Sequence, residues 1–391
     1  MNQGSAPFSI RSSTREFNLT HGFLPEQDPL MHLPPAFAEW ERLAEQLPKI
    51  LTTPLLQESL QTLPNFPIHQ LKTPSEFERA MMLLSYLGQA YVWSSKPTVQ
   101  QIPAVLAKPW YAVASQVGRP PILSYASYAL YNWRRIEKNK PIELGNIALL
   151  QNFLGGLDEE WFILVHVDIE AKAIPGLNAI IPLQQAIKHQ QLEAVTQHLE
   201  TIFQTLQAMC HTLRRMPENC DPYIYYNRVR PYIHGWKDNP ALPNGLIYED
   251  VFDNQPQFFK GETGAQSTII PVFDSTFGID HADNPLKAHL EEMKIYMPPD
   301  HRTFLANIAE KMRTREYVKK SSAQNPQLKT LYNECVKLIF EFRRIHLNYA
   351  TQYIQNQHQT SIGNPTMVGT GGTPFIQYLG KHLKETDKYL L

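Results

Sequence analysis

Apolar residues recur every three or four positions along most of this chain, which is the pattern of helices with one buried face. No internal repeat and no convincing strand alternation interrupts it. We therefore predict an all-α fold. The predicted helices are 37–51, 75–93, 105–118, 120–136, 161–177, 183–216, 221–231, 286–296, 302–315, 326–354 and 375–383. Proline-rich and glycine-rich stretches at 1–35 and 237–270 predict irregular segments, and 54–72 predicts a loop or short helix.

The helix predicted at 326–354 carries a histidine, His346, within its apolar stripe. A buried imidazole needs a hydrogen-bond partner or a metal, because an unsatisfied buried polar group is costly. Haem iron is commonly held by a helical histidine in an apolar cavity. Two interpretations stay open on this pattern, an iron ligand or a core histidine bonded to a backbone carbonyl. The apolar stripe consists of Leu331, Cys335, Leu338, Ile339, Phe342, Ile345, Tyr349 and Tyr353.

Composition restricts the classes of function. The chain has 391 residues, 43% of them hydrophobic, which is enough for more than one core. With 36 Lys+Arg against 37 Asp+Glu, the net charge of -1 argues against nucleic-acid binding as the main activity. Three cysteines without a CxxC pair do not make a disulfide framework. The polar N-terminus has no signal-peptide pattern and no segment is a membrane span, so we expect a cytoplasmic protein.

Several further residues have candidate chemistry. Arg230 follows two tyrosines, and a guanidinium in an aromatic pocket suits a ligand carboxylate, although stacking on a surface ring is an equal alternative. His166 lies in an apolar run, four residues after Phe162, so the two share a helix face. The GTGGT stretch at 369–373 lacks the GK[ST] of a phosphate loop and favours a mobile lid. The GETGAQS stretch at 261–267 permits close approach of backbone to a flat ligand, and either stretch can also be an ordinary connection.

Seven motifs together resemble the indoleamine 2,3-dioxygenase family, across roughly residues 120–391. They occur in the family's order, and the strings YMPPDHR and GTGGT are the rarest. The motifs are PPILSYASYALYNW, WFILVHVDIEA, YYNRVRPYIHGWKDNPALPNGLIYE, FKGETGAQS, KIYMPPDHRTFL, FRRIHLNYATQYI and GTGGT.

The resemblance implies a small N-terminal helical domain at 1–145 and a large haem-binding domain at 146–391. It implies that His346 is the proximal ligand of haem b iron and that Arg230 binds the substrate carboxylate. It also implies that Asp274 and Arg343 lie near the haem propionates. It also implies which residues surround the substrate, namely Tyr125, Tyr128, Phe162, Ile163, Tyr225, Gly264 and the lid residue Thr373. The residues that it places over the haem are Gly261, Thr263 and Ala265.

Three positions depart from the animal members of that family. His166 stands where they have serine, Tyr128 where they have a small residue, and Tyr225 where they have phenylalanine. A histidine at the distal position is similar to the tryptophan 2,3-dioxygenases, in which it bonds the indole N–H. Together the three changes predict a smaller and more polar pocket.

From the resemblance we predict a haem-dependent dioxygenase that opens the indole 2,3 bond of L-tryptophan to give N-formylkynurenine, the first step of the kynurenine pathway. Its partners are then an indole substrate, dioxygen and an electron donor that keeps the iron ferrous, and the protein is a monomer. Alternatives are a haem monooxygenase or dioxygenase acting on a substituted indole, and a haem-binding or gas-sensing protein without turnover. A sensor needs neither Arg230 nor GTGGT, which argues against it. A helical scaffold without any cofactor is the last alternative.

Overall fold

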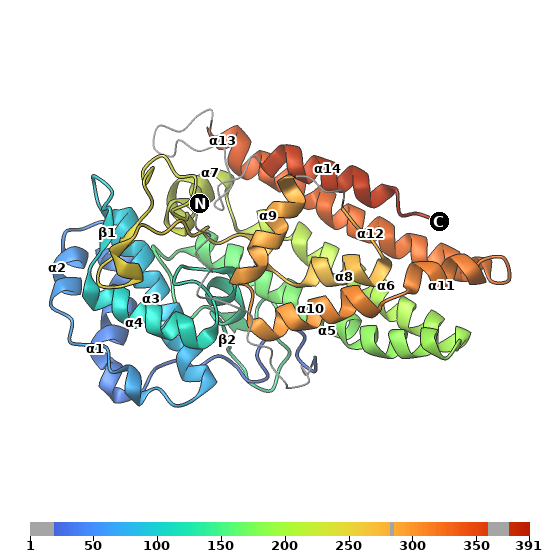
Figure 1. Cartoon of the computed structure of the whole chain (residues 1–391), viewed down its shortest axis with the longest axis horizontal. Helices are drawn as coiled ribbons and strands as arrows, with labels where there is room; N and C mark the ends of the chain where they lie inside the picture. The colour runs from blue at the N-terminus through green and yellow to red at the C-terminus, as the bar shows by residue number, and fades with distance from the viewer. Residues whose placement is uncertain (1–18, 282–284, 359–374) are drawn as a thin grey trace.

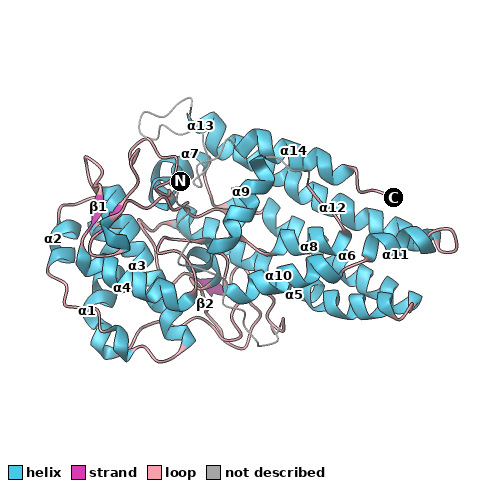
Figure 2. Cartoon of the chain, in the orientation of Figure 1, coloured by secondary structure: helices cyan, strands magenta, loops and turns pink. Residues whose placement is uncertain are grey.

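The computed structural model describes residues 19–281, 285–358 and 375–391. Within these ranges the regular secondary structure is almost entirely helical, with loops between the helices, and the prediction of an all-α fold is confirmed (Figure 2). The strands there are two residues long each: β1 (Gln101–Ile102) pairs in parallel with β4 (Ile247–Tyr248), and β2 (Arg134–Arg135) pairs antiparallel with β3 (Ile147–Ala148).

The helices form two groups along the long axis of the molecule (Figure 1). Helices α1 to α4 pack at one end, and the other end is a bundle in which α6 contacts both α5 and α12, and α14 lies against α12. The helices of the first group are α1 (Ala38–Ile50), α2 (Leu55–Gln61), α3 (Pro74–Ser94) and α4 (Ala104–Val117). Those that follow are α5 (Leu157–Lys188), α6 (Leu192–Arg214), α7 (Pro222–Ile224), α8 (Ile269–Phe277), α9 (Pro285–Met293), α10 (Pro299–Lys311), α11 (Thr314–Ser321), α12 (Pro326–Ala350), α13 (Asn356–His358) and α14 (Phe375–Asp387).

The boundary between α5 and α6 differs from the prediction. Helix α5 runs on beyond the predicted end at 177, with Pro175 and Pro182 inside it, and the turn falls at His189–Gln191, within the single helix predicted at 183–216. Proline in a helix interior costs about 3 kcal/mol in isolation. Full burial of Leu177, Ile180 and Leu183 on α5 offsets that cost. Gln190 adopts a left-handed backbone conformation, φ 56°, that periodicity does not encode.

Two other predicted helices are also wrong in extent. The segment 120–136 is mostly irregular, with a single π-turn at Ala126–Leu130 followed by β2. The helix predicted at 302–315 is divided between α10, which starts earlier at Pro299, and α11. Aromatic residues at helical spacing in 120–136 pack into the core from irregular backbone, so spacing alone overstated the helix there.

Two hydrophobic clusters make up the core. The first gathers α1, α3, α4 and the turn at Ala126–Leu130, together with residues of 233–251; the second gathers α5, α6, α8, α10 and α12. Residues of α5 belong to both clusters, since Ile163, Leu164 and Val167 face the first and Val165 and Ile169 the second. The central helix α5 is therefore buried on most sides. The division into domains at residue 145 stays a prediction.

Helices long and apolar enough to cross a membrane do not occur among the described residues. The cysteines Cys210, Cys220 and Cys335 are all buried and unpaired. Cys335 is fully buried on α12, as its place in the apolar stripe predicts.

Candidate functional site

His346 lies on the inward face of α12 and is nevertheless accessible. Its neighbours one turn away on that face, Arg343 and Ala350, are buried, whereas His346 itself is exposed. Burial by the surrounding protein and the nearby His166 lower the pKa of the imidazole to about 4. The ring is thus exposed at its surface and yet surrounded by protein. A ring that borders a space enclosed by the protein would have both properties. The buried stripe of α12 runs through Leu328, Tyr332, Cys335, Val336, Ile339 and Arg343.

His166 on α5 is close enough to His346 to contribute to the lowered pKa of that imidazole. Burial lowers the pKa of His166, so the ring is neutral at neutral pH. Its Nδ1 lies 2.7 Å from the carbonyl oxygen of Phe162, one turn earlier. A carbonyl only accepts, so Nδ1 carries the proton and Nε2 is left with a lone pair. The distal imidazole is therefore a hydrogen-bond acceptor toward the enclosed space.

Aromatic rings surround His166. The ring of Phe162 lies 4.8 Å from the imidazole and 4.5 Å from the ring of Tyr225, between centroids. Tyr125 meets the imidazole edge-on at 6.0 Å, and Tyr128 lies 6.3 Å from Phe162. The structure thus brings together the four aromatic residues that the sequence assigned to one pocket. Ile163, the next residue of α5, is fully buried.

Arg230 is fully buried at the end of the turn that carries Tyr225. Its guanidinium carbon lies 5.3 Å from the centre of the Tyr226 ring. Burial lowers the pKa of Arg230, although that pKa starts so high that the group stays cationic. A cation in this surrounding is suited to a carboxylate ligand, because low dielectric strengthens a charge-assisted hydrogen bond.

A buried carboxylate near Tyr125 was missed by the sequence analysis. Glu170 accepts hydrogen bonds from the hydroxyls of Tyr125 at 2.9 Å and Ser267 at 3.0 Å. Burial outweighs these bonds and raises its pKa to about 7. Burial likewise raises the pKa of Glu262 to about 8. The signal was present, since Glu170 comes one helical turn after His166 and therefore shares its helix face.

The glycine-containing loop at 261–267 has two different parts. A Cβ on Gly261 would come within 2.3 Å of the backbone nitrogen of Gly235, so this glycine serves the close approach of two backbone segments. A Cβ on Gly264 would meet nothing within 4 Å. Thr263 and Ala265 beside it are partly exposed. Of the two glycines, Gly264 is the one with room beside it for a flat ligand.

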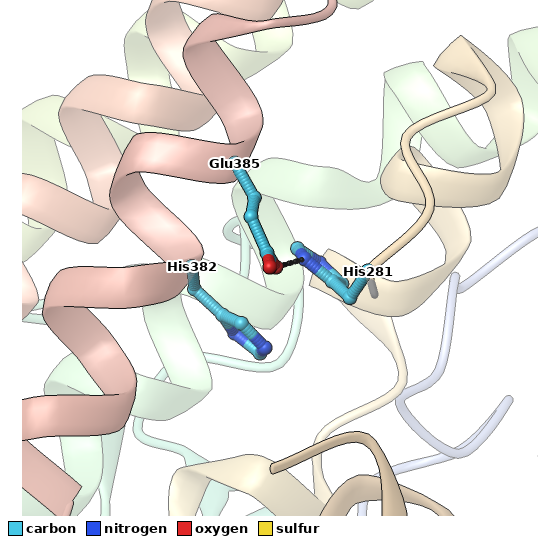
Figure 3. Close-up of side chains that lie close together, drawn as sticks. All are labelled: His281, His382 and Glu385. Carbon is cyan, nitrogen blue, oxygen red and sulfur yellow. Dashed lines mark hydrogen bonds and ion pairs between the residues drawn. The ribbon is translucent and has the colours of Figure 1, made fainter. Parts of the chain in front are cut away.

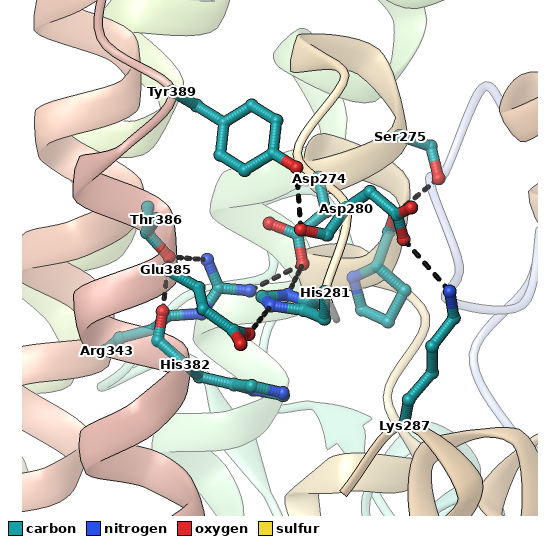
Figure 4. A network of polar contacts seen from close by, with 11 residues as sticks. Asp274, Ser275, Asp280, His281, Lys287, Arg343, His382, Glu385, Thr386 and Tyr389 are labelled. Atoms are coloured by element: carbon teal, nitrogen blue, oxygen red, sulfur yellow. Dashed lines mark hydrogen bonds and ion pairs between the residues drawn. The ribbon is translucent and has the colours of Figure 1, made fainter. Parts of the chain in front are cut away.

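Asp274 on α8 and Arg343 on α12 form a buried ion pair (Figure 4). Burial opposes ionisation of Asp274, but Arg343 and His281 outweigh it, so its pKa is lowered. Arg343 also donates to the hydroxyl of Thr386 on α14 at 2.7 Å. The ion pair therefore ties three helices together beside His346. Thr373 lies outside the described residues.

These observations fit a haem group. A neutral imidazole with an accessible lone pair on a long helix is the donor that haem iron takes, and the space it borders is lined by aromatic rings. The site also has a buried cation, Arg230, and a loop position with open space beside it, Gly264. Fold and site together define a helical haem-dependent oxidoreductase.

Comparison with known proteins shows the family to which this oxidoreductase belongs. The family model described as indoleamine 2,3-dioxygenase matches residues 13–389. Indoleamine 2,3-dioxygenase 1 of Rattus norvegicus is 34% identical over 93% of this chain and 91% of its own. Indoleamine 2,3-dioxygenase 2 of Homo sapiens is 33% identical, covering 96% and 94%. A 6-hydroxytryptophan 2,3-dioxygenase of Fusarium equiseti is 30% identical, covering 93% of each. The chain belongs to the indoleamine 2,3-dioxygenase family and is a haem-dependent dioxygenase that acts on indoles with dioxygen.

Proposed function

We propose that the enzyme opens the indole 2,3 bond of L-tryptophan to give N-formylkynurenine. The observation that carries this proposal is a buried cation, Arg230, on the same short segment as Tyr225, whose ring packs on Phe162 beside the acceptor His166. An amino acid with an indole side chain offers a carboxylate for the cation, a flat ring for the aromatic walls and an N–H for the acceptor.

His346 would hold the haem iron from the proximal side. Ferrous haem supplies the binding and activation of dioxygen, and the chain's own residues supply orientation. The Asp274–Arg343 pair fixes the inward face of α12, and the partly exposed Thr263 and Ala265 with Gly264 leave a loop open to the flat cofactor. We assign Gly261 to the same loop, where its contact with Gly235 sets the backbone path.

His166 would accept a hydrogen bond from the indole N–H through Nε2. The alternative, donation of a proton from His166 to an oxygen ligand, requires the other tautomer and loss of the 2.7 Å bond to the Phe162 carbonyl. That change would give up one intramolecular hydrogen bond, a net contribution of about 1 kcal/mol. Recognition of the substrate N–H is therefore the role that the tautomer supports.

Arg230 would anchor the carboxylate while Phe162, Tyr225 and Ile163 pack the indole. Fixing both ends of the substrate holds the 2,3 bond in one place, and such positioning contributes several kcal/mol to rate without any proton transfer by the protein. Tyr125 would border the same pocket, held by its bond to Glu170. Thr373 stays a predicted lid residue.

A hydroxylated indole is the second candidate substrate. The hydroxyl of Tyr128 is buried and has no hydrogen-bond partner among the described residues. A ring hydroxyl on the substrate would satisfy it, and one relative carries the name 6-hydroxytryptophan 2,3-dioxygenase. We further propose a cytoplasmic monomer that works in the kynurenine pathway and receives electrons from a separate donor.

The test is turnover by haem-loaded, reduced protein. A Soret band with formylkynurenine and two added oxygen atoms from L-tryptophan supports the proposal. Faster turnover of 6-hydroxytryptophan, lost in Tyr128→Phe while L-tryptophan turnover is kept, would move the assignment to the second candidate. One added oxygen atom would mean monooxygenation, and a Soret band without product from either compound would contradict both.

A further inference from the structure

A second cluster of metal-ligating side chains lies away from His346. His281, in the segment after α8, meets His382 and Glu385 of α14 (Figure 3). All three residues are buried, and one ligand atom from each lies within 4.8 Å of the other two. His382 and Glu385 are three residues apart, so they project from the same face of α14. We propose that this cluster is a structural binding site for a divalent transition-metal ion, of which Zn²⁺ is the natural occupant.

The donor types fit that ion. Two imidazole nitrogens and one carboxylate oxygen form a set that zinc accepts, with water completing a tetrahedron. Bonds of 2.0–2.1 Å at a tetrahedral angle place ligand atoms roughly 3.3 Å apart. His281 Nδ1 and Glu385 Oε2 are already 2.9 Å apart, so these two need to open only slightly to admit the ion.

A supporting carboxylate lies on the other side of His281. Nε2 of His281 is 3.5 Å from Oδ2 of Asp274, while Nδ1 faces Glu385. Metal-bound histidines usually donate their second ring N–H to a carboxylate, which fixes the tautomer and orients the ring. Asp274 is in the position to do this, and it is itself held by Arg343 (Figure 4).

The charges around the cluster favour a cation. When His281 is neutral, as a metal ligand must be, Asp274 and Glu385 bring two negative charges, and the positive charge of Arg343 offsets one of them. A divalent ion would therefore enter a buried site that still holds one uncompensated carboxylate, which is costly without a partner.

His382 must move for the ion to bind. The rings of His281 and His382 are stacked, with centroids 3.9 Å apart and planes at 19°, so their lone pairs cannot meet at one point. Nε2 of His382 is buried and makes no hydrogen bond within the described parts of the chain. Rotation of this ring therefore breaks no hydrogen bond at Nε2. It also allows this buried nitrogen to coordinate the metal ion. The bound ion would join α14 to the segment after α8, next to the proximal helix α12.

The experiment is metal analysis of the untagged, haem-loaded protein. After dialysis against buffered Zn²⁺ and desalting, we expect one zinc and one haem iron per chain. The variants His382→Gln and Glu385→Gln should bind zinc at least tenfold more weakly and keep their haem. Matched controls are the exposed His69→Gln and, on the same helix, the exposed Asp387→Asn, which should retain zinc like the wild type.

Zinc K-edge absorption gives an independent readout, because imidazole ligands produce characteristic outer-shell scattering. Two imidazoles per zinc are expected. If His382→Gln does not fold, judged by circular dichroism and haem content, the Glu385→Gln variant still answers the question. No zinc retained by the wild type, equal zinc in the cluster variants and the wild type, or zinc without imidazole scattering would each overturn the proposal.

Discussion

The two histidine sites of this protein differ in what surrounds the imidazoles. His346 is accessible, His166 lies among aromatic rings, and neither makes an ion pair with an acidic side chain in the described ranges. His281 and His382 are closed in, stacked on each other and beside two carboxylates. An accessible imidazole on an inward helix face indicates a large ligand from outside the chain, whereas a closed cluster with carboxylates has room only for a small ion.

The largest difference between the two sites should appear when one histidine of each is replaced by alanine. We expect His346→Ala to lose haem and with it all measurable turnover, because the iron has no other ligand on α12. His382→Ala should keep a full Soret band. Haem titration followed at the Soret band measures both. Stoichiometric haem of normal affinity in His346→Ala would contradict the proximal assignment.

The next largest effect concerns Arg230. Replacement by glutamine removes a buried charge-assisted bond to the substrate carboxylate, worth about 2–4 kcal/mol, so kcat/KM should fall by about 30- to 1000-fold. Arg228→Gln is the matched control, since Arg228 is exposed two residues away. Steady-state kinetics with L-tryptophan and with tryptamine, which lacks the carboxylate, give the readout. An equal loss with both compounds would mean that Arg230 acts on structure and not on the carboxylate.

The carboxylate beside the haem-site aromatics predicts a pH dependence of stability. Burial raises the pKa of Glu170 to about 7 in the folded state, above its ordinary value near 4.5, so the folded protein binds the proton more tightly than the unfolded chain. Its stabilising contribution is therefore complete below about pH 4.5 and is lost as pH rises through about 7, by up to about 3 kcal/mol.

Urea unfolding at several pH values between 4.5 and 8 measures this loss. Glu170→Gln should unfold with a flatter pH dependence than the wild type. Glu193→Gln, at an exposed position on α6, should leave the slope unchanged. The same slope in Glu170→Gln and the wild type would show that Glu170 is not the titrating group.

The smallest effect is expected at His166. It tests whether this imidazole recognises the indole N–H. His166→Ala removes one neutral hydrogen bond of about 1 kcal/mol, so KM for L-tryptophan should rise about fivefold with haem retained. For 1-methyl-L-tryptophan, which has no indole N–H, the same substitution should not raise KM. A rise of equal size for both substrates would argue against recognition of the N–H, and loss of haem would refute the distal assignment.

Periodicity predicted the helical class and the existence of α3, α4 and α12. Each of these follows from local spacing of apolar residues, which fixes the face that must be covered. The boundaries that failed were decided elsewhere: α5 runs through Pro175 and Pro182 because its flanking residues are buried, and Gln190 turns the chain where no breaker residue stands.

The sequence by itself also determined the family, because ordered motifs are local strings. Their order assigned Arg230, Tyr225 and Phe162 to the substrate pocket. Only the tertiary structure decided the tautomer of His166, the exposure of His346 on an inward face, and the raised pKa of Glu170.

The meeting of His281 with His382 and Glu385 was likewise decided by the fold. These residues stand about a hundred positions apart in the chain, with a separation of 104 between His281 and Glu385. No local pattern records such a distance, because the packing of α14 against α12 brings it beside His281. Local spacing determines which residues are buried, and the packing of distant helices determines which of the buried groups meet.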